Sequence, residues 1–248
     1  MRRTTKLYLI ISYLIFPIIF SFSLDNDITV VTNHWYPYSN ESSPREGLSI
    51  EIIIEAFKTQ NYTVTVIITP WARAIREVLN SEYDILANVW FSKERAEEFL
   101  YSDYYYTNTI TFISNIDDPF EYTNLESLSG KTIGTIRDFY YNELFMNSEK
   151  FIREPANDLL QNILKVVYGR IDLTLSDEVV AKSNIRDTRM DLYSKIYFSK
   201  KPLIENKLYI TCSYKNSRNK ELIEAFNRGL EVIIKNGEYK RIINKYIK

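Results

Sequence analysis

Side chains that commonly carry covalent or metal chemistry are scarce in this sequence. It has one histidine, His34, and one cysteine, Cys212, among 248 residues. The chain therefore cannot form a His/Cys zinc cluster or an internal disulfide. The sequence also lacks the G-x-S-x-G turn of serine hydrolases, the phosphate-binding P-loop and the G-x-G-x-x-G fingerprint of dinucleotide-binding proteins. We therefore predict no metal site, no cofactor and no catalytic residues.

Two charged residues could hold a polar molecule, but each also has a simpler structural interpretation. Arg95 carries a guanidinium that can bind both oxygens of a carboxylate through parallel charged hydrogen bonds. With Glu94 and Glu97 beside it, it is equally typical of a solvated helix that begins near Ser92. Asp177 follows a predicted strand and precedes a predicted helix, where a carboxylate also satisfies free backbone N–H groups. The residues alone leave both interpretations open.

The elements that must position these residues alternate between apolar strands and amphipathic helices. Such an order is typical of α/β proteins with mostly parallel sheets, in which ligands bind beyond the carboxyl ends of the strands. The segments 76–88 and 165–176 share one helix-turn-strand pattern, which indicates two lobes of similar construction. We predict strands over residues 28–32, 64–68, 84–89, 131–136 and 171–175, with helices between them and two C-terminal helices on either side of Asn236-Gly237.

The first 23 residues have the three-part pattern of a secretory signal peptide. Three cations precede an apolar run over residues 7–20, and small residues surround a cleavage point after Ser23. The run is shorter than the roughly 20 residues of a membrane span, although an uncleaved anchor is the alternative. We therefore expect export to the periplasm.

Cleavage of this segment would change the formal net charge from −1 to −4. A mildly acidic chain without a basic tract is not typical of a nucleic-acid-binding protein. About 225 residues would remain, enough for one large domain or two small ones with real cores. We expect this product to be a monomer.

A series of short motifs follows one another over nearly the whole chain after residue 23. They are Trp35-Tyr36-Pro37-Tyr38, Gly47 before a helix, Pro70-Trp71-Ala72-Arg73-Ala74, Asp84 before a strand, Glu94-Arg95-Ala96, Tyr101-Ser102-Asp103-Tyr104-Tyr105, Leu128-Ser129-Gly130-Lys131-Thr132-Ile133-Gly134, Gly169-Arg170-Ile171-Asp172, Ser176-Asp177-Glu178 and Asn236-Gly237-Glu238-Tyr239. In this order and spacing the chain resembles family 3 of the extracellular solute-binding proteins, which serve polar amino-acid ABC importers.

The resemblance implies a two-lobed α/β fold, the type II periplasmic-binding-protein fold, with a mostly parallel sheet flanked by helices in each lobe. Lobe 1 would comprise residues 24–112 and 208–248, and lobe 2 would comprise residues 113–207. Two crossing hinge strands are expected near Thr109–Ser114 and Lys207–Ser213. The lobes would close on a small amino-acid-like solute and deliver it to an ABC permease.

The resemblance also implies roles for individual residues. Arg95 would bind the carboxylate of the ligand, and Asp177 would bind its α-ammonium group. Trp71 with Trp35 or Tyr36 would form flat walls, since aromatic rings exclude water and attract an ammonium group over their faces. Further polar contacts are expected from Asn88, Ser92 and Tyr140.

The solute itself and the use made of it are less tightly predicted. Asn33 occupies a position where many cation-selective relatives have an aspartate, and Arg73 and Arg137 are predicted near the cleft. Together these residues favour an acidic or a neutral polar ligand. Two other functions occur on this fold: an exported dehydratase of prephenate- or arogenate-like acids, which needs an acid to protonate the leaving hydroxyl, and a ligand-sensing module for a receptor. No residue of the sequence is singled out as such an acid.

Overall fold

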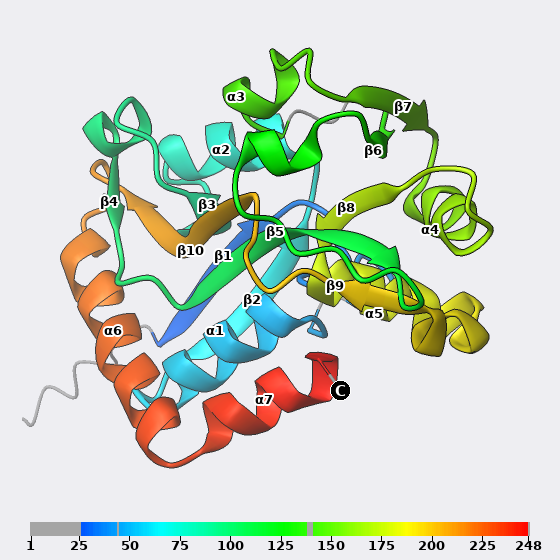
Figure 1. Cartoon of the computed structure of the whole chain (residues 1–248). Coiled ribbons are helices and arrows are strands. Elements are labelled where there is room, and N and C mark those ends of the chain that lie inside the picture. Colours follow the sequence, from blue (N-terminus) through cyan, green and yellow to red (C-terminus); the bar gives the residue numbers. More distant parts are fainter. Residues whose placement is uncertain (1–25, 44, 138–140, 248) are drawn as a thin grey trace, which may run out of the picture.

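The computed structural model describes residues 26–43, 45–137 and 141–247 and has a two-lobed α/β fold (Figure 1). The predicted signal peptide, residues 1–23, lies outside the described residues. No helix within the described ranges combines the length and the apolar character that crossing a membrane requires. The helices are α1 (Leu48–Lys58), α2 (Trp71–Leu79), α3 (Glu143–Met146), α4 (Leu159–Val167), α5 (Glu178–Thr188), α6 (Asn219–Lys235) and α7 (Glu238–Ile247).

The strands of the described residues form one continuous curled sheet. Its order is β2-β1-β3-β10-β5-β8-β6-β7, with β4 added to β10 and β9 added to β5. The strands are β1 (Asp27–Thr32), β2 (Thr63–Ile68), β3 (Ile85–Trp90), β4 (Phe99–Tyr101), β5 (Tyr106–Asn115), β6 (Thr132–Ile136), β7 (Ile152–Ala156), β8 (Leu173–Asp177), β9 (Ile196–Phe198) and β10 (Ile204–Ser213).

Parallel pairs lie at both ends of this sheet. At one end β1 pairs in parallel with β2 and β3, and at the other β6 pairs in parallel with β7 and β8. In β1, Val30 packs into the core with α1 and α6, and Val31 packs with α2 on the opposite face, because helices cover both faces of the strand. We call the half with β1–β4, α1, α2, α6 and α7 the first lobe, and the half with β6–β9 and α3–α5 the second lobe. The predicted fold class is confirmed.

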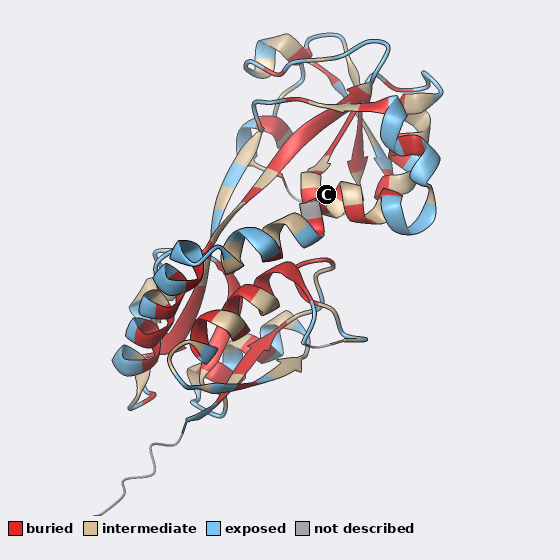
Figure 2. Cartoon of the chain, turned by 90° about the horizontal axis from the view of Figure 1, so that it is seen from below, coloured by how far each residue is buried: buried red, intermediate tan, exposed pale blue. Residues whose placement is uncertain are grey.

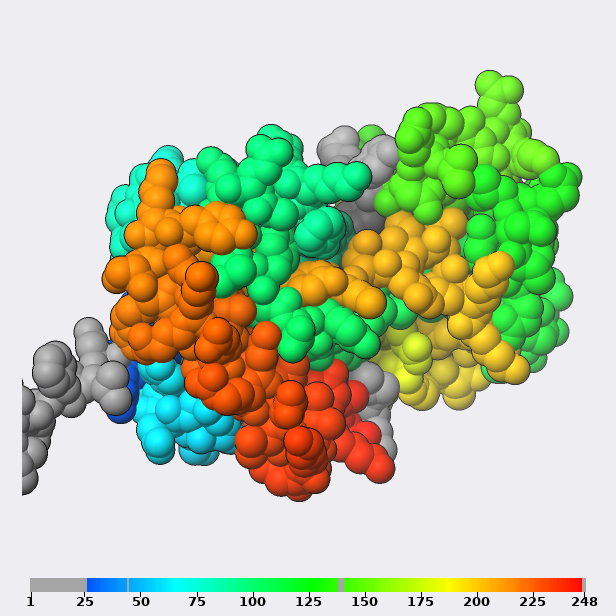
Figure 3. All heavy atoms as spheres, turned by 90° about the vertical axis from the view of Figure 1, so that its left-hand side faces the viewer, coloured from blue at the N-terminus to red at the C-terminus, as the bar shows by residue number. Residues whose placement is uncertain are grey.

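Each lobe has its own hydrophobic core. In the first lobe, Phe57 of α1 packs against Phe226 of α6, with ring centroids 5.6 Å apart. In the second lobe, Phe112 of β5 packs against Tyr122 and Phe145. The C-terminal helices return to the first lobe, and Figure 3 shows the orange and red segments gathered beside the cyan N-terminal ones.

The long antiparallel strands β5 and β10 connect the two lobes. β10 pairs with β3 and β4 of the first lobe, whereas β5 pairs with β8 and β9 of the second lobe. Figure 2 shows the two bodies joined by such extended strands. Each strand contains one of the predicted hinge segments. The lobe limits predicted after residues 112 and 207 fall inside these strands, and they stay a prediction.

Gly229 allows a close contact between α6 and α1 in the first lobe. A Cβ atom at this position of α6 would lie 2.1 Å from the backbone oxygen of Ala56 in α1. Backbone cannot move away as a flexible side chain can. Replacing Gly229 by alanine is therefore expected to lower the free energy of unfolding by about 1–3 kcal/mol, in spite of the better helix propensity of alanine. Glu231→Ala, on the exposed face of α6, is the matched control and should change it by less than about 0.5 kcal/mol. Equal denaturant midpoints for both variants would contradict the packing argument.

Candidate ligand-binding cleft

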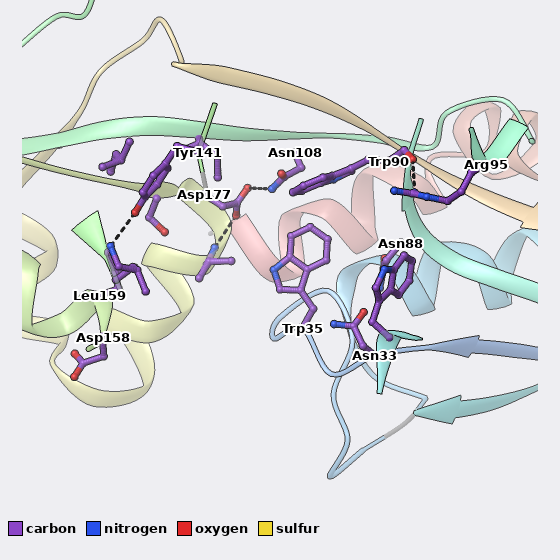
Figure 4. Close-up of a pocket in the computed structure, with 16 residues that line it drawn as sticks. Asn33, Trp35, Asn88, Trp90, Arg95, Asn108, Tyr141, Asp158, Leu159 and Asp177 are labelled. Atoms are coloured by element: carbon purple, nitrogen blue, oxygen red, sulfur yellow. Dashed lines mark hydrogen bonds between the residues drawn. The ribbon is translucent and has the colours of Figure 1, made fainter. Parts of the chain in front are cut away.

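A cleft of about 690 Å³ lies between the lobes. Its lining residues follow the carboxyl ends of parallel strands or begin the helices after them, which is where open α/β sheets bind ligands. The hinge strand β5 adds two more. The cleft is lined by Asn33, Trp35, Trp71, Asn88, Trp90, Arg95, Asn108, Ile110, Ile136, Tyr141, Asp158, Leu159, Leu175, Ser176, Asp177 and Val180. Figure 4 shows the labelled members of this set converging from both lobes.

Asp177 is the most buried charged residue of this lining, with 4% of its surface exposed. Oδ1 accepts a hydrogen bond of 2.8 Å from the backbone N–H of Val180 and thereby caps α5. Oδ2 accepts hydrogen bonds from the Tyr38 hydroxyl, 2.9 Å away, and from Nδ2 of Asn108, 2.5 Å away. Asp177 therefore caps a helix, as its structural interpretation predicted, and it also lines the cleft, where a ligand contact is possible.

Burial raises the pKa of Asp177 above its ordinary range, and the hydrogen bonds from Val180, Tyr38 and Asn108 oppose this shift. The cause is desolvation, which disfavours the charged form. No basic group is among the main influences on the pKa of Asp177. A cation entering the cleft could supply the missing charge partner.

Tyr38 is held in place by the turn that starts α1. The backbone N–H of Ser49 donates to the Tyr38 carbonyl oxygen at 3.2 Å. Gly47 has φ 133, and a Cβ there would lie 2.4 Å from the same oxygen, so only glycine fits. The predicted glycine before the first helix therefore positions a first-lobe hydroxyl against the second-lobe carboxylate Asp177.

Arg95 supplies the only guanidinium among the described lining residues. It begins a short 3-10 helix, Arg95–Glu97, and its Nη1 donates to the carbonyl oxygen of Trp90 at 2.8 Å. This bond uses one of the five N–H donors of the guanidinium and leaves others for a ligand. Figure 4 shows Arg95 and Asp177 on opposite sides of Trp35.

Three tryptophans form the apolar walls of the cleft. Trp35 lies against Tyr38, with ring centroids 4.4 Å apart, and meets Trp90 edge to face at 6.1 Å. Trp71 begins α2 and lines the same space. Trp90 was not among the predicted site residues, although its place at the end of a predicted strand was a usable signal. It is 38% exposed and lines the cleft.

Asn88 lines the cleft, but its amide is already fully engaged within the first lobe. Nδ2 donates to the hydroxyls of Thr32 and Ser39, and Oδ1 accepts from the Tyr105 hydroxyl. Its φ of 60 lies in the left-handed region, which asparagine tolerates better than most residues. The geometry therefore favours a structural role for this side chain over the predicted ligand contact.

Three other predicted residues are not among the described lining residues. The Tyr36 hydroxyl donates to Asp187 across the lobes, at 2.5 Å. Ser92 accepts from the backbone N–H of Arg95 at 3.4 Å. Tyr140 lies outside the described residues.

The two further arginines predicted near the cleft also have other partners. Nε of Arg73 donates to Glu77 at 2.6 Å, and Nε of Arg137 donates to Asn157 at 3.3 Å. Neither residue is among those that line the cleft. These two arginines therefore give no reason to expect an acidic ligand.

Asn108 and Asp158 are charged or polar lining residues that the sequence did not single out. Asn108 lies in the hinge strand β5, among residues of alternating apolar character that look structural. Asp158 is the N-cap of α4, where its Oδ1 accepts from the backbone N–H of Gln161 at 2.9 Å. An aspartate directly before a leucine-rich helix was a signal for Asp158. No local signal marked Asn108.

The fold is that of a two-lobed α/β protein with a cleft between its lobes. The chain belongs to the bacterial extracellular solute-binding proteins, family 3, which it matches over residues 28–248. The predicted family is thereby confirmed.

Individual relatives are distant but span nearly the whole chain. The arginine-binding periplasmic protein of Mannheimia haemolytica is 24% identical over 229 residues, covering 89% of this chain and 91% of the relative. The lysine/arginine/ornithine-binding periplasmic protein of Escherichia coli is 24% identical over 246 residues, covering 90% and 88%.

Solved structures share the fold. The second substrate-binding domain of GlnP from Lactococcus lactis, in an open conformation, superposes with a TM-score of 0.72 at 22% identity and covers 89% of this chain and 95% of its own. The L-cystine solute receptor of Neisseria gonorrhoeae, unliganded and open, has a TM-score of 0.73 at 16% identity, covering 89% and 92%.

Proposed function

We propose that this protein is an exported binding protein that captures a small neutral or cationic amino acid between its lobes and delivers it to an ABC permease in the membrane. One observation carries the proposal: a guanidinium and a buried carboxylate line the same cleft, with tryptophans beside them, and no lysine or arginine is among the main influences on that carboxylate in the described part of the chain. A free amino acid offers the complementary groups, a carboxylate and an ammonium separated by one carbon atom.

Arg95 would bind the ligand carboxylate with the N–H groups that Trp90 leaves free, because a guanidinium matches both carboxylate oxygens. Asp177 would bind the ammonium group, and the new ion pair would offset the cost of its buried charge. The rings of Trp35 and Trp71 would then enclose the ligand and exclude water.

The charges of the cleft support a neutral or cationic ligand. Three charged residues line it in the described part of the chain, namely Arg95, Asp158 and Asp177, so negative charge exceeds positive charge by one. Once Arg95 and Asp177 hold the backbone groups of an amino acid, Asp158 is left, and a carboxylate side chain on the ligand would find no cation there. The names of the curated relatives, which include arginine-binding and L-cystine-binding proteins, agree with this choice.

Capture would proceed by closure of the lobes around the hinge strands β5 and β10. Two hydrogen bonds already cross from the first lobe to the second, from Tyr36 to Asp187 and from Tyr38 to Asp177. A ligand that contacts both lobes would shift the population toward the closed state. The permease would recognise that closed state, so the protein itself would break no bond.

The hydrogen bonds of Asp177 disfavour the alternative function as a dehydratase. A general acid needs a carboxyl group that gives up its proton to the substrate. Asp177 has the raised pKa of such a group, but its two oxygens accept hydrogen bonds from Val180, Tyr38 and Asn108, all of which stabilise the ionised form. We therefore expect no turnover of prephenate or arogenate by the purified protein.

A thermal-shift screen tests the proposed function directly. The probes are the proteinogenic amino acids and L-cystine, each beside its analogue without the ammonium group. A ligand that binds only the folded state, at about 100 times its dissociation constant, adds about 2.7 kcal/mol of stability, which raises the melting temperature by roughly 5–10 °C in a chain of this size. We expect a neutral or cationic amino acid to give this shift and its deaminated analogue to give much less. Stabilisation by none of these amino acids would refute the proposal.

A further inference from the structure

Asn108 is a buried polar residue of the cleft whose hydrogen bonding is incomplete. It has no exposed surface, and it lines the cleft from the hinge strand β5. Its Nδ2 is engaged, but its Oδ1 has no hydrogen-bond partner among the described residues. A buried acceptor without a donor costs free energy, so such atoms are rare in folded proteins and call for an explanation.

The orientation of the Asn108 amide is fixed by its neighbours. Nδ2 donates to Asp177 Oδ2 at 2.5 Å and lies 3.3 Å from the Tyr38 hydroxyl oxygen. Because the Asp177 carboxylate is an acceptor, the amide cannot turn its oxygen toward it without losing this bond. Asn108 is also opposite Asn206 in the β5–β10 ladder, which holds its backbone in place. The oxygen is therefore held beside the Asp177 carboxylate, without a partner among the described residues, on a residue that lines the cleft.

We propose that Asn108 Oδ1 is a second acceptor for the ligand ammonium group, beside Asp177. One N–H of the ammonium donates to the Asp177 carboxylate and a second donates to Asn108 Oδ1. Two acceptors on one nitrogen require at least two N–H groups. The cleft therefore selects primary and singly N-substituted ammonium groups and discriminates against N,N-dimethylated and betaine-type solutes.

This inference rests on the proposed function, since it concerns how the same amino acid is held. It adds a selectivity that a lone carboxylate does not have, because a carboxylate attracts any cation, including one without N–H groups. With Asn108 as a second acceptor, affinity depends on how many N–H groups the ligand nitrogen carries. A ligand that cannot donate to Asn108 Oδ1 leaves this oxygen unsatisfied and binds more weakly.

The experiment compares two ligands on two variants of the full chain by isothermal calorimetry. The ligands are the amino acid that binds most tightly among the proteinogenic amino acids and L-cystine, and its N,N-dimethyl form. Asn108→Ala removes the orphan acceptor together with one donor to Asp177. Tyr38→Phe is the matched control, because it removes the other side-chain donor to Asp177 Oδ2 and leaves Asn108 in place.

In the wild type we expect the dimethyl form to bind about 10- to 100-fold more weakly, the range for a hydrogen bond to a charged group. Asn108→Ala should weaken the parent amino acid by a similar factor and bring the two ligands to within about threefold of each other. Tyr38→Phe should keep the discrimination. If Asn108→Ala unfolds, Asn108→Ser, whose hydroxyl is too short to reach the same point, takes its place.

The outcomes separate this inference from the proposed function. The role of Asn108 is refuted if the dimethyl form binds as tightly as its parent amino acid, or if Asn108→Ala still discriminates between them. In both cases the proposed function as an amino-acid-binding protein is unaffected. If no amino acid binds, both the proposed function and the role of Asn108 are refuted.

Discussion

Replacing Arg95 by alanine is expected to weaken amino-acid binding by about 2–5 kcal/mol, the cost of leaving a buried ligand carboxylate without its charged partner. The carboxylate would lose the hydrogen bonds as well as the charge, because Arg95 is the only guanidinium among the described residues that line the cleft. Isothermal calorimetry with the best ligand of the screen measures this loss. Lysine at this position should recover only part of it, since an ammonium group cannot bind both oxygens in one plane.

Arg73→Ala is the matched control for the Arg95 variant. Arg73 lies in the first lobe as well, but it is paired with Glu77 and does not line the cleft. Its loss should leave the dissociation constant within about twofold, because Arg73 does not line the cleft, but it also removes the ion-pair partner of Glu77, which is buried. Arg95 also donates to the Trp90 carbonyl, so the unfolding midpoint of both variants must be measured. Unchanged affinity in a folded Arg95→Ala protein would remove Arg95 from the site.

Replacing Asp177 by asparagine is the second change with a large expected effect. Asparagine caps a helix as well as aspartate does, so α5 should keep its N-terminus. The negative charge beside the ligand ammonium is lost, which should cost about 2–5 kcal/mol of affinity. A ligand analogue without the ammonium group should be affected much less. Equal losses for both ligands would contradict the assigned contact.

The raised pKa of Asp177 adds a pH dependence to this prediction. The folded, ligand-free protein binds the Asp177 proton more tightly than the unfolded chain does. Its stability should therefore fall as the pH rises from the ordinary aspartate range through the raised value. Affinity for an amino acid should change in the opposite sense and fall as the pH is lowered through the same window. Asp177→Asn should lack both effects, and a wild-type affinity that stays constant across this window would show that Asp177 does not bind a cation.

The local pattern of the sequence was enough for five strands (β1, β2, β3, β6 and β8) and for part of the site, whereas the short elements β4, β7, β9 and α3 were not predicted. The predicted strand at residues 64–68 corresponds to β2, and the residues after it begin α2 with Trp71, as expected. Asp177 was recognised as a residue between a strand and a helix, and it is the N-cap of α5. Such features depend on neighbours a few residues away, so periodicity and capping rules reach them.

The choice among similar residues required the tertiary structure. The sequence offered Arg73, Arg95 and Arg137 near the cleft, and only the folded chain shows that the first and last have partners outside it. The same holds for Asn88, whose amide is saturated by groups that arrive from elsewhere in the first lobe.

Asn108 and Tyr38 show most clearly what the sequence could not determine. They meet Asp177 from positions 69 and 139 residues away along the chain. No short-range pattern encodes a hydrogen bond over such a separation, because it forms only when the hinge strand and both lobes are packed together. The sequence by itself determined the family, the order of five strands with the helices that follow them, and the aromatic character of the cleft. The tertiary structure decided which polar atoms are free to meet a ligand.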